Sequence, residues 1–435
     1  MRRAASLILS VGLLAACSAA PNVSVSPAED ASGRSPSASP SLQTPAAPSA
    51  TPATTAPPAT PPSAAAFEWS EQVAMSGLEG FSLYRPLLVH ARGAYVVAEQ
   101  SRIWVSGDAR RWDVADSPVD GNAQIEIRDL VAGESGIIAV GTESIDADND
   151  GSPEDSRAVV LTSNDGRLWQ RLDDWRFEHA AMNLVGLSRQ GVVAFGYTLG
   201  GVGASIWTSA DGHDWLKATN ESGLEVAKGV QVIAESDGRL TAFVALPGPT
   251  LDESGPVEVW QTEGRADWEK IGELRDPSGA YVHLAAYGGG RWLALGVGAG
   301  TRAWSSTDGV HWNHAPTPGD QGVNAIVGWA GGLIAAGSTG TEPGETCGGD
   351  EPYVGRTWLS TGANWQALPP TEGAAITALV IVGDRIVGIG QAVRADGGVD
   401  PVQWTATLAT LPAQPMPEPT PTPSPTPRNG NGCGS

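Results

Sequence analysis

The sequence has little positive charge, few cysteines and few aromatic residues other than tryptophan. Its 26 Lys and Arg are set against 48 Asp and Glu, which gives a formal net charge of −22. Nucleic acids and anionic lipid surfaces repel so acidic a chain, so we expect no nucleic-acid partner. Cationic partners, metal ions and neutral sugars remain open.

Signatures of catalysis and of cofactor binding are also missing. The six His are scattered, without the H-x-H or H-E-x-x-H spacing that zinc sites use. The glycine-rich segment YGGGRW (287–292) is followed by no helical pattern, so it predicts a turn between strands rather than a nucleotide-binding loop. The sequence thus contains no catalytic constellation, and we favour a protein that is not an enzyme.

Glycine, proline and tryptophan are abundant instead, with 55, 33 and 16 residues respectively. Many turns combined with a recurring aromatic residue suit an all-β fold of short strands better than a helical fold.

The N-terminus has the features of an export signal. Arg2 and Arg3 precede a short apolar stretch, Ala4–Leu14, which is too short to span a bilayer as a mature helix. The stretch ends in Leu-Ala-Ala-Cys at Cys17, a segment that resembles the lipobox of bacterial lipoproteins. The resemblance implies removal of residues 1–16, diacylglycerol and fatty acyl groups such as palmitate on Cys17, and anchoring at the extracytoplasmic face of the cell membrane. The alternative is an ordinary secretory signal with a chance cysteine.

Two segments are too poor in large apolar side chains to form a core. Residues 17–66 are rich in Pro, Ser, Thr and Ala, and we expect them to form a disordered tether behind the lipid. Residues 411–435 form a second Pro-rich tail. The folded domain is therefore expected over residues 67–410.

One pattern recurs through that domain. An apolar strand ending near Gly is followed by a hairpin with an aromatic position on each arm. The hairpins read IWVSGDARRW, VLTSNDGRLW, IWTSADGHDW, VWQTEGRADW, AWSSTDGVHW and TWLSTGANW. Repeats of about 40–50 residues with four strands each are typical of β-propeller blades.

Three of these hairpins share the pattern Ser-x-Asp-Gly-x-x-Trp, with the aspartates at Asp165, Asp211 and Asp308. Asp can accept hydrogen bonds from backbone N–H groups in the turn, and Gly can take a positive φ. The pattern resembles a compact form of the Asp-box, or BNR, repeat of sialidases and of many non-enzymatic propellers. The resemblance implies that these three aspartates are structural.

The number of blades follows from the hairpins. Six complete hairpins end at Trp112, Trp169, Trp215, Trp268, Trp312 and Trp365. A seventh copy starts at Ala375 and stops after the strand of Trp404, without its last arm. The segment around Trp69 has no preceding hairpin and can supply that arm. We therefore expect seven blades closed by pairing of the two chain ends, with six or eight as alternatives.

The acidic segment DADNDGSPED (146–155) is the sharpest local motif. Carboxylates at alternate positions followed by Gly resemble the calcium loops of EF-hands and of integrin-type propellers, and oxygen ligands suit Ca²⁺. The expected ligands are Asp146, Asp148, Asp150, Ser152 and Glu154, with Asp155 as an alternative closing carboxylate. A solvated acidic loop without metal is the competing interpretation.

Cys347 lies in a long loop and Cys433 in the C-terminal tail. Outside the cytoplasm they could form a disulfide that ties the tail to the sixth blade. Two unpaired thiols, or a bridge between molecules, are equally open.

Two functions remain. The first is a monomeric, membrane-anchored propeller that binds a protein or glycan without catalysis. The second is a sialidase-like surface glycoside hydrolase, since Tyr84 and Arg85 resemble the Tyr-Arg-Ile-Pro segment of that family. The resemblance is incomplete, because the Ile is absent and the further arginines and the Tyr–Glu pair cannot be assigned from spacing.

Overall fold

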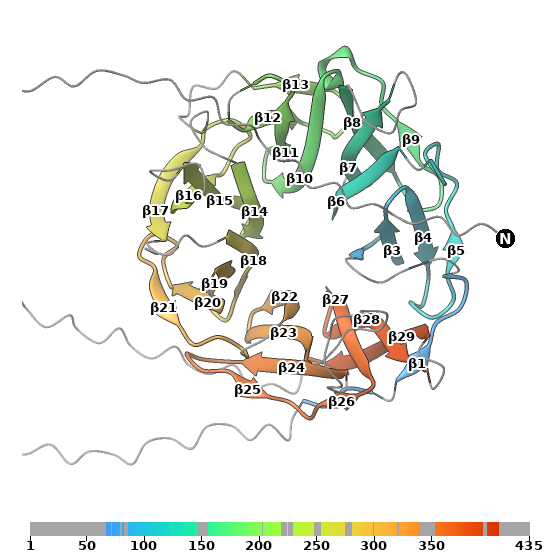
Figure 1. Ribbon diagram of the computed structural model, residues 1–435, viewed down its shortest axis with the longest axis vertical. Coiled ribbons are helices and arrows are strands. Elements are labelled where there is room, and N and C mark those ends of the chain that lie inside the picture. The colour runs from blue at the N-terminus through green and yellow to red at the C-terminus, as the bar shows by residue number, and fades with distance from the viewer. Residues whose placement is uncertain are drawn as a thin grey trace, which may run out of the picture. The chain divides into compact units, whose positions relative to one another are not determined.

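The computed structural model describes residues 67–408, apart from 71, 79–80, 82–85, 123, 135, 147–154, 202, 219–223, 225–228, 248–253, 275–280, 299, 320–321, 340–352 and 395–397. These residues form seven antiparallel sheets arranged in a ring (Figure 1). The prediction of an all-β, seven-bladed propeller is confirmed. No helix in the described part is both long and apolar enough to cross a membrane.

The blades are numbered along the chain, and each is given from its innermost to its outermost strand. Blade 1 contains β2 (Leu87–Ala91), β3 (Ala94–Glu99), β4 (Arg102–Ser106) and β5 (Asp113–Val114). Blade 2 contains β6 (Ile125–Gly133), β7 (Gly136–Ile145), β8 (Asp155–Ser163) and β9 (Gln170–Arg171). Blade 3 contains β10 (Ala180–Ser188), β11 (Gly191–Thr198), β12 (Ser205–Ser209) and β13 (Trp215–Lys217). A 3-10 turn, η2 (Trp175–Phe177), lies between blades 2 and 3 in the sequence.

Blades 4 to 7 follow the same plan. Blade 4 contains β14 (Gly229–Ser236), β15 (Arg239–Pro247), β16 (Ser254–Thr262) and β17 (Glu269–Leu274). Blade 5 contains β18 (Tyr281–Gly288), β19 (Arg291–Gly298), β20 (Gly300–Ser306) and β21 (Asn313–Ala315). Blade 6 contains β22 (Val323–Trp329), β23 (Gly332–Thr339), β24 (Val354–Ser360) and β25 (Gln366–Ala367), with β26 (Thr371–Glu372) also on β24. Blade 7 contains β27 (Ala374–Val382), β28 (Arg385–Val393), β29 (Val399–Thr407) and β1 (Val73–Ala74).

The two ends of the chain close the ring in blade 7. Strand β1 pairs with β29, with Val73 opposite Gln403 and Ala74 opposite Val402. The backbone N–H of Ser70 adds a 2.7 Å hydrogen bond to the carbonyl of Thr405. The predicted origin of the seventh blade is confirmed, and the pairing covers an edge of β29 that would otherwise be free to aggregate.

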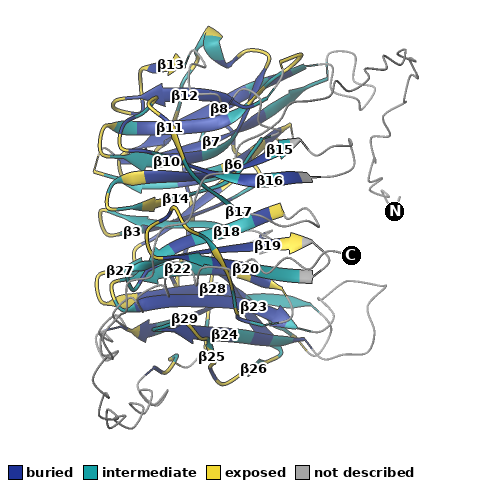
Figure 2. Ribbon diagram, turned by 90° about the vertical axis from the view of Figure 1, so that its left-hand side faces the viewer, coloured by how far each residue is buried: buried dark blue, intermediate teal, exposed yellow. Residues whose placement is uncertain are grey.

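The antiparallel strand order gives the ring two different faces. Turns from the first to the second strand, and from the third to the fourth, lie on one face, which we call the hairpin face. Links from the second to the third strand, and from one blade to the next, lie on the opposite face, which we call the loop face. In Figure 2 the loop face is on the right, the side toward which the arrowheads of β15 and β19 point. The buried centres of the strands lie between the two faces.

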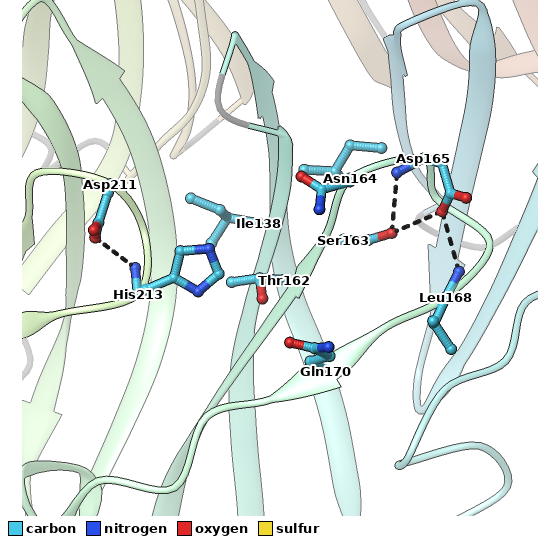
Figure 3. Close-up of a pocket in the computed structure, with 10 residues that line it drawn as sticks. Ile138, Thr162, Ser163, Asn164, Asp165, Leu168, Gln170, Asp211 and His213 are labelled. Carbon is cyan, nitrogen blue, oxygen red and sulfur yellow. Dashed lines mark hydrogen bonds between the residues drawn. The ribbon is translucent and has the colours of Figure 1, made fainter.

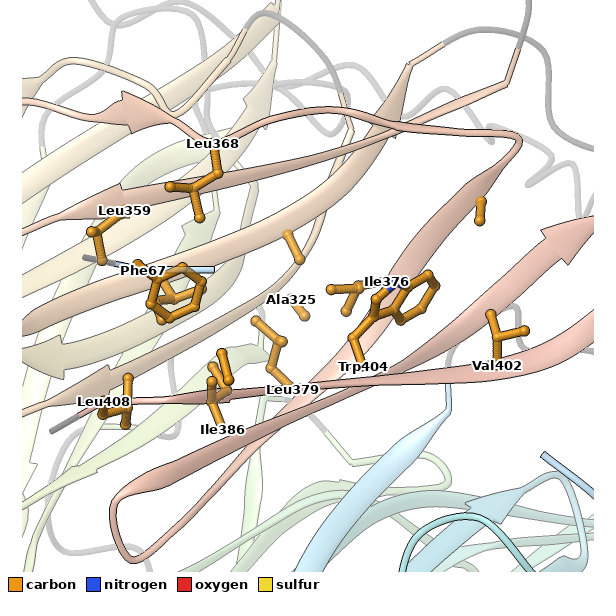
Figure 4. Close-up of a cluster of buried hydrophobic side chains, with 14 residues drawn as sticks. Phe67, Ala325, Leu359, Leu368, Ile376, Leu379, Ile386, Val402, Trp404 and Leu408 are labelled. Atoms are coloured by element: carbon orange, nitrogen blue, oxygen red, sulfur yellow. The ribbon is translucent and has the colours of Figure 1, made fainter. Parts of the chain in front are cut away.

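The core lies between neighbouring blades rather than at one centre. Between blades 6 and 7, Leu359 and Leu368 of one blade pack with Ile376 and Trp404 of the next (Figure 4). Phe67, from the N-terminal segment, is buried in the same cluster. Each such side chain contributes about 1.5–3 kcal/mol when fully buried, so every seam between blades stabilises the ring.

Six of the seven innermost strands carry a register shift at the same level, which the sequence analysis did not predict. The residue skipped by the pairing is polar each time: Arg128, Asn183, Gln231, His283, Asn324 and Thr377. A bulge turns a side chain out of its regular alternation. Gln231 of blade 4 thereby accepts a 2.9 Å hydrogen bond from the backbone N–H of Val282 in blade 5. The bulge of blade 4 thus places a polar side chain where it joins two neighbouring blades.

Candidate functional site

The aspartates of the repeated hairpins are engaged by their own turns. Asp165 Oδ1 accepts hydrogen bonds from the backbone N–H groups of Arg167 (2.8 Å) and Leu168 (3.2 Å). Asp211 Oδ1 does the same with the two residues at the corresponding positions, at 2.8 and 3.1 Å. Asp308 Oδ1 repeats the arrangement at 2.9 and 2.8 Å. Each of these carboxylates therefore uses Oδ1 to hold the backbone of its own turn, which is a structural role.

The electrostatics of the turns agree with that geometry. The hydrogen bond from the Arg167 N–H lowers the pKa of Asp165, and the hydrogen bond from the His213 N–H lowers the pKa of Asp211. The Trp that ends each hairpin is fixed by the same turn, since Trp215 Nε1 donates to the carbonyl of Gly212 at 2.9 Å. Gly212 has φ +86°, which residues with a side chain rarely adopt.

A fourth hairpin of this kind was missed in the sequence. In blade 1, Asp108 Oδ1 accepts from the backbone N–H groups of Arg110 (2.8 Å) and Arg111 (3.0 Å). The next residue is Ala109 rather than Gly, and it takes φ +60°. The pattern Asp-Gly does not match this turn. A pattern that requires only Ser and, six residues later, Trp does match it, from Ser106 to Trp112.

The seam between blades 2 and 3 has a pocket at each end. The hairpin-face pocket has a volume of about 220 Å³ and is shown in Figure 3. It lies between the Asp165 hairpin of blade 2 and the Asp211 hairpin of blade 3, and His213 extends across it. Both aspartates at its rim are held by their turns, so the polar groups that this pocket offers to a ligand are those of Thr162, Asn164, Gln170 and His213.

The loop-face pocket at the other end of the seam has a volume of about 250 Å³. Blade 2 contributes polar side chains from three adjacent strands, and blade 3 contributes apolar surface. The lining residues are Glu126, Arg128, Thr142, Ser144, Asp155, Ser156, Tyr197 and Leu199. Tyr197 and Leu199 are 44% and 45% exposed, although both are large hydrophobic residues.

Two buried hydroxyl groups distinguish this pocket. Thr142 and Ser156 are only 9% and 8% exposed, and neither Thr142 Oγ1 nor Ser156 Oγ has a hydrogen-bond partner among the described residues. A buried hydroxyl without a partner costs about 1–3 kcal/mol, so such groups are rare without a reason. Ser144 pairs with Ser156 and lies two residues from Thr142, so Thr142 and Ser156 occupy one face of blade 2. That face is turned toward blade 3, because Val140 and Ala158 on it pack in the core between the two blades.

The charged groups of the loop-face pocket are already paired. Arg128 and Glu126 form an ion pair at 2.8 Å. His179 Nδ1 lies 2.7 Å from Asp155 Oδ2, and the hydrogen bond with His179 lowers the pKa of Asp155. The pocket therefore has polar character without a large unbalanced charge.

The acidic loop expected to bind calcium begins and ends beside this pocket. Strand β7 ends at Ile145, opposite Asp155, the first residue of β8. Residues 147–154 lie outside the described part, and with them Asp148, Asp150, Ser152 and Glu154; Asp146 is described. Asp155, the alternative closing ligand, is hydrogen-bonded to His179.

The remaining sites expected from the sequence, Cys17, Cys347, Cys433, Tyr84 and Arg85, also lie outside the described residues. The loop-face pocket itself was not predicted. Its residues come from three strands of one blade and one strand of the next, and none of them forms a motif in the sequence.

No protein-family model matches the sequence, and no curated protein matches it. Solved structures resemble the ring with low identity. They include a Dyadobacter fermentans protein of unknown function (12% identity, TM-score 0.42, 79% of this chain and 99% of that chain). They also include the phage phi92 endosialidase (9%, 0.43, 79% and 69%) and a Penicillium chrysogenum α-L-arabinanase complexed with arabinobiose (12%, 0.42, 79% and 99%). The assignment of seven blades thus rests on the strand pairings of the chain itself.

Proposed function

We propose that this chain is a lipid-anchored, extracytoplasmic propeller that binds a neutral, hydroxyl-rich ligand, such as a glycan, in the loop-face pocket without catalysis. The observation that carries the proposal is the pair of buried hydroxyls, Thr142 Oγ1 and Ser156 Oγ, which have no described partner. A ligand that displaces the groups covering these two oxygens can donate a hydrogen bond to one and accept a hydrogen bond from the other, which removes the penalty of two unpaired buried hydroxyls.

The other lining groups favour a ligand without net charge. Glu126 is ion-paired with Arg128 and Asp155 is hydrogen-bonded to His179, so a charged ligand would have to displace one of these partners. The exposed ring of Tyr197 offers a flat apolar surface with a polar end, which suits the C–H face of a sugar ring. A short list of polar groups beside one aromatic ring is typical of small-ligand sites.

The test is binding to an array of immobilised neutral and sialylated oligosaccharides, followed by calorimetry with the best neutral oligosaccharide. We expect the double variant Thr142→Val, Ser156→Ala to bind at least about tenfold more weakly, since each hydrogen bond contributes about 1 kcal/mol. Thr162→Val is the matched control, because Thr162 is a buried threonine of the same blade that lines the hairpin-face pocket. Equal affinity in wild type and double variant would refute the proposed site.

The same assays separate this proposal from the alternative, a sialidase-like hydrolase. Binding without turnover of a fluorogenic sialoside supports the binding function. Turnover that is abolished in Arg85→Ala would replace it with the catalytic one. Capture of a protein ligand, with no response on the oligosaccharide array, would retain the binding propeller but reject a glycan.

The membrane anchor is a separate part of the proposal and depends on Cys17. We expect the full chain to incorporate labelled palmitate in a bacterial host and to fractionate with membranes. Cys17→Ala should be unlabelled and remain soluble or unprocessed, and a labelled Cys17→Ala protein would exclude lipidation at this position.

We also propose that Ca²⁺ binds the loop of residues 146–154 and holds it beside the pocket. Asp146, Asp148 and Asp150 would supply oxygen ligands, with the Ser152 carbonyl and Glu154 completing the set. A site of this kind raises the melting temperature when filled. If the melting temperature is the same in Ca²⁺ and in EDTA, for both wild type and Asp148→Ala, the metal site is absent.

A further inference from the structure

The seam where the ring closes, between blades 7 and 1, contains a pocket whose chemistry differs from that of the other two. It has a volume of about 290 Å³ and opens on the hairpin face. Its polar lining consists of Tyr95, Asp108 and Arg110 from blade 1 and Arg385, Gln403 and Thr405 from blade 7. Two exposed guanidinium groups thus face one pocket in a chain whose net charge is −22.

The guanidinium of Arg110 is held in place by a buried partner. Gln403 is only 2% exposed, and its amide is assigned the orientation that gives both of its ends a hydrogen-bond partner, in which its N–H donates to the carbonyl of Ala109 at 2.8 Å. In that orientation the Gln403 oxygen accepts from Arg110 Nε at 2.9 Å. This bond fixes one side of the guanidinium and leaves the two terminal nitrogens for another acceptor. A guanidinium fixed in this way is suited to bidentate binding of a planar or tetrahedral oxyanion.

The acidic residue of the pocket, Asp108, offsets only part of the positive charge of the two arginines: the backbone N–H of Arg111 and, to a smaller extent, the charge of Arg110 lower the pKa of Asp108. Asp108 Oδ1 accepts hydrogen bonds from two backbone N–H groups and from Ser106 Oγ, as in the other hairpins. Neither Arg110 nor Arg385 forms an ion pair with a carboxylate among the described residues. Because two guanidinium groups face the pocket and only one carboxylate does, the formal charge of the pocket is positive.

The hairpin-face pocket between blades 2 and 3 occupies the equivalent position. Val387 pairs with Thr405 in blade 7 as Ile138 pairs with Thr162 in blade 2. Arg110 follows Asp108 at the spacing at which His213 follows Asp211. The two pockets differ because Arg385 stands two residues before Val387, whereas in blade 2 Gly136 stands two residues before Ile138. Blade 7 therefore adds a guanidinium at a position where blade 2 has no side chain.

We propose that the closure-seam pocket binds an oxyanion group, phosphate or carboxylate, between Arg110 and Arg385. The ligand would be a phosphate- or carboxylate-bearing molecule of the cell exterior, and it is distinct from the neutral ligand of the loop-face pocket. Both walls of the pocket contact the N-terminal segment that closes the ring: Gln403 of blade 7 pairs with Val73, and the backbone carbonyl of Arg110 in blade 1 accepts a 2.9 Å hydrogen bond from the backbone N–H of Ser76. A bound oxyanion would consequently stabilise the closed ring.

The test follows the melting temperature of the full chain during titration with sodium phosphate, sodium sulfate and sodium acetate, with sodium chloride at matched ionic strength as reference. We expect a saturable rise of about 2 °C or more with at least one oxyanion, beyond the effect of chloride. Response to phosphate and sulfate alone identifies a tetrahedral ligand, and response to acetate alone identifies a carboxylate.

Variants locate the effect. Arg385→Gln and Arg110→Gln should each weaken the apparent affinity for the responding oxyanion about tenfold or more. Arg167→Gln is the matched control. Arg167 is an exposed arginine on another hairpin; its guanidinium forms an ion pair with Asp113 at 3.6 Å, and it lies outside the pocket. A shift that is absent in wild type, or is equally large in Arg385→Gln and wild type, would overturn the proposal. Binding of neutral oligosaccharides should be the same in both arginine variants and wild type, so the two proposed sites can fail independently.

Discussion

The two ends of the seam between blades 2 and 3 share strands β7 and β8 of blade 2 but satisfy their polar groups in different ways. At the hairpin face, Asp165 and Asp211 are engaged by backbone N–H groups of their own turns. At the loop face, Thr142 and Ser156 bury hydroxyls without a described partner, and Tyr197 remains exposed. The hairpin end therefore stabilises the blade, whereas the loop end bears a cost in free energy that a ligand can remove.

The largest loss of stability is expected when Trp215, the tryptophan at the hairpin end of the seam, is replaced. Trp215 is 1% exposed and packs in the core between blades 2 and 3. Trp215→Ala should lower the free energy of unfolding by about 3–5 kcal/mol, since it removes a large buried side chain and leaves a cavity. Urea denaturation measures the loss, with the neighbouring Leu216→Ala as control because Leu216 is 60% exposed. A loss under about 1 kcal/mol would contradict a stabilising role for the hairpin end.

A buried carboxyl lies between the two ends and makes the seam sensitive to pH. Asp129 Oδ2 accepts from the backbone N–H of Val185 in blade 3 at 2.8 Å, and burial raises the pKa of Asp129 to about 7. The folded state therefore retains the proton above the ordinary pKa of 3.8, at which the unfolded chain loses it. Stability from this group is complete below pH 4 and falls as pH rises toward 7, by roughly 4 kcal/mol at most.

Equilibrium unfolding between pH 4 and 8 tests this dependence in the wild type and in Asp129→Asn. The amide does not titrate, so the fall in stability with rising pH should be reduced in the variant. If both proteins show the same slope, Asp129 is not the responsible group.

Replacing an aspartate of the hairpin turns should lower the free energy of unfolding by less. Its contribution should also depend on pH in the opposite sense to that of Asp129. Asp211→Ala removes the acceptor of two backbone hydrogen bonds and should cost about 1–2 kcal/mol. Because those bonds lower the pKa of Asp211, the stability is present above pH 4 and is lost as pH falls through the lower, folded-state value. Thermal unfolding at pH 7 and at pH 3 should show a difference between wild type and variant that shrinks at the lower pH. Asp214→Ala is the control on the same hairpin, and an equal loss there would assign the effect to net charge.

The smallest effect on stability is expected at the loop end. Thr142→Val and Ser156→Ala replace hydroxyls that lack described partners, so the free energy of unfolding should be unchanged or rise by up to about 1 kcal/mol. The same variants should lose affinity for neutral oligosaccharides. A clear loss of stability, such as 2 kcal/mol in urea, would show that the hydroxyls have partners within the protein and would remove the contrast between the two ends.

Local sequence patterns predicted the repeating unit well. The paired aromatic positions and the Asp-Gly turns lie within a few residues of each other, so they are visible in one hairpin. The turn at Asp108 escaped because Ala109 holds the positive φ usually taken by Gly. The polar residues at the bulges also escaped, since a register shift is defined by the partner strand and not by the strand's own sequence.

The sequence by itself determined the repeat, the seven blades and the closure of the ring by the two chain ends, because each depends on short-range hydrophobic periodicity and turn chemistry. It also predicts the export signal and the acidic loop, which are contiguous motifs. Only the tertiary structure brought Thr142, Ser156 and Tyr197 to one pocket and Arg110 and Arg385 to another. Such sites lie between blades, where the angle and spacing of two sheets decide which side chains meet, and no single repeat encodes that relation.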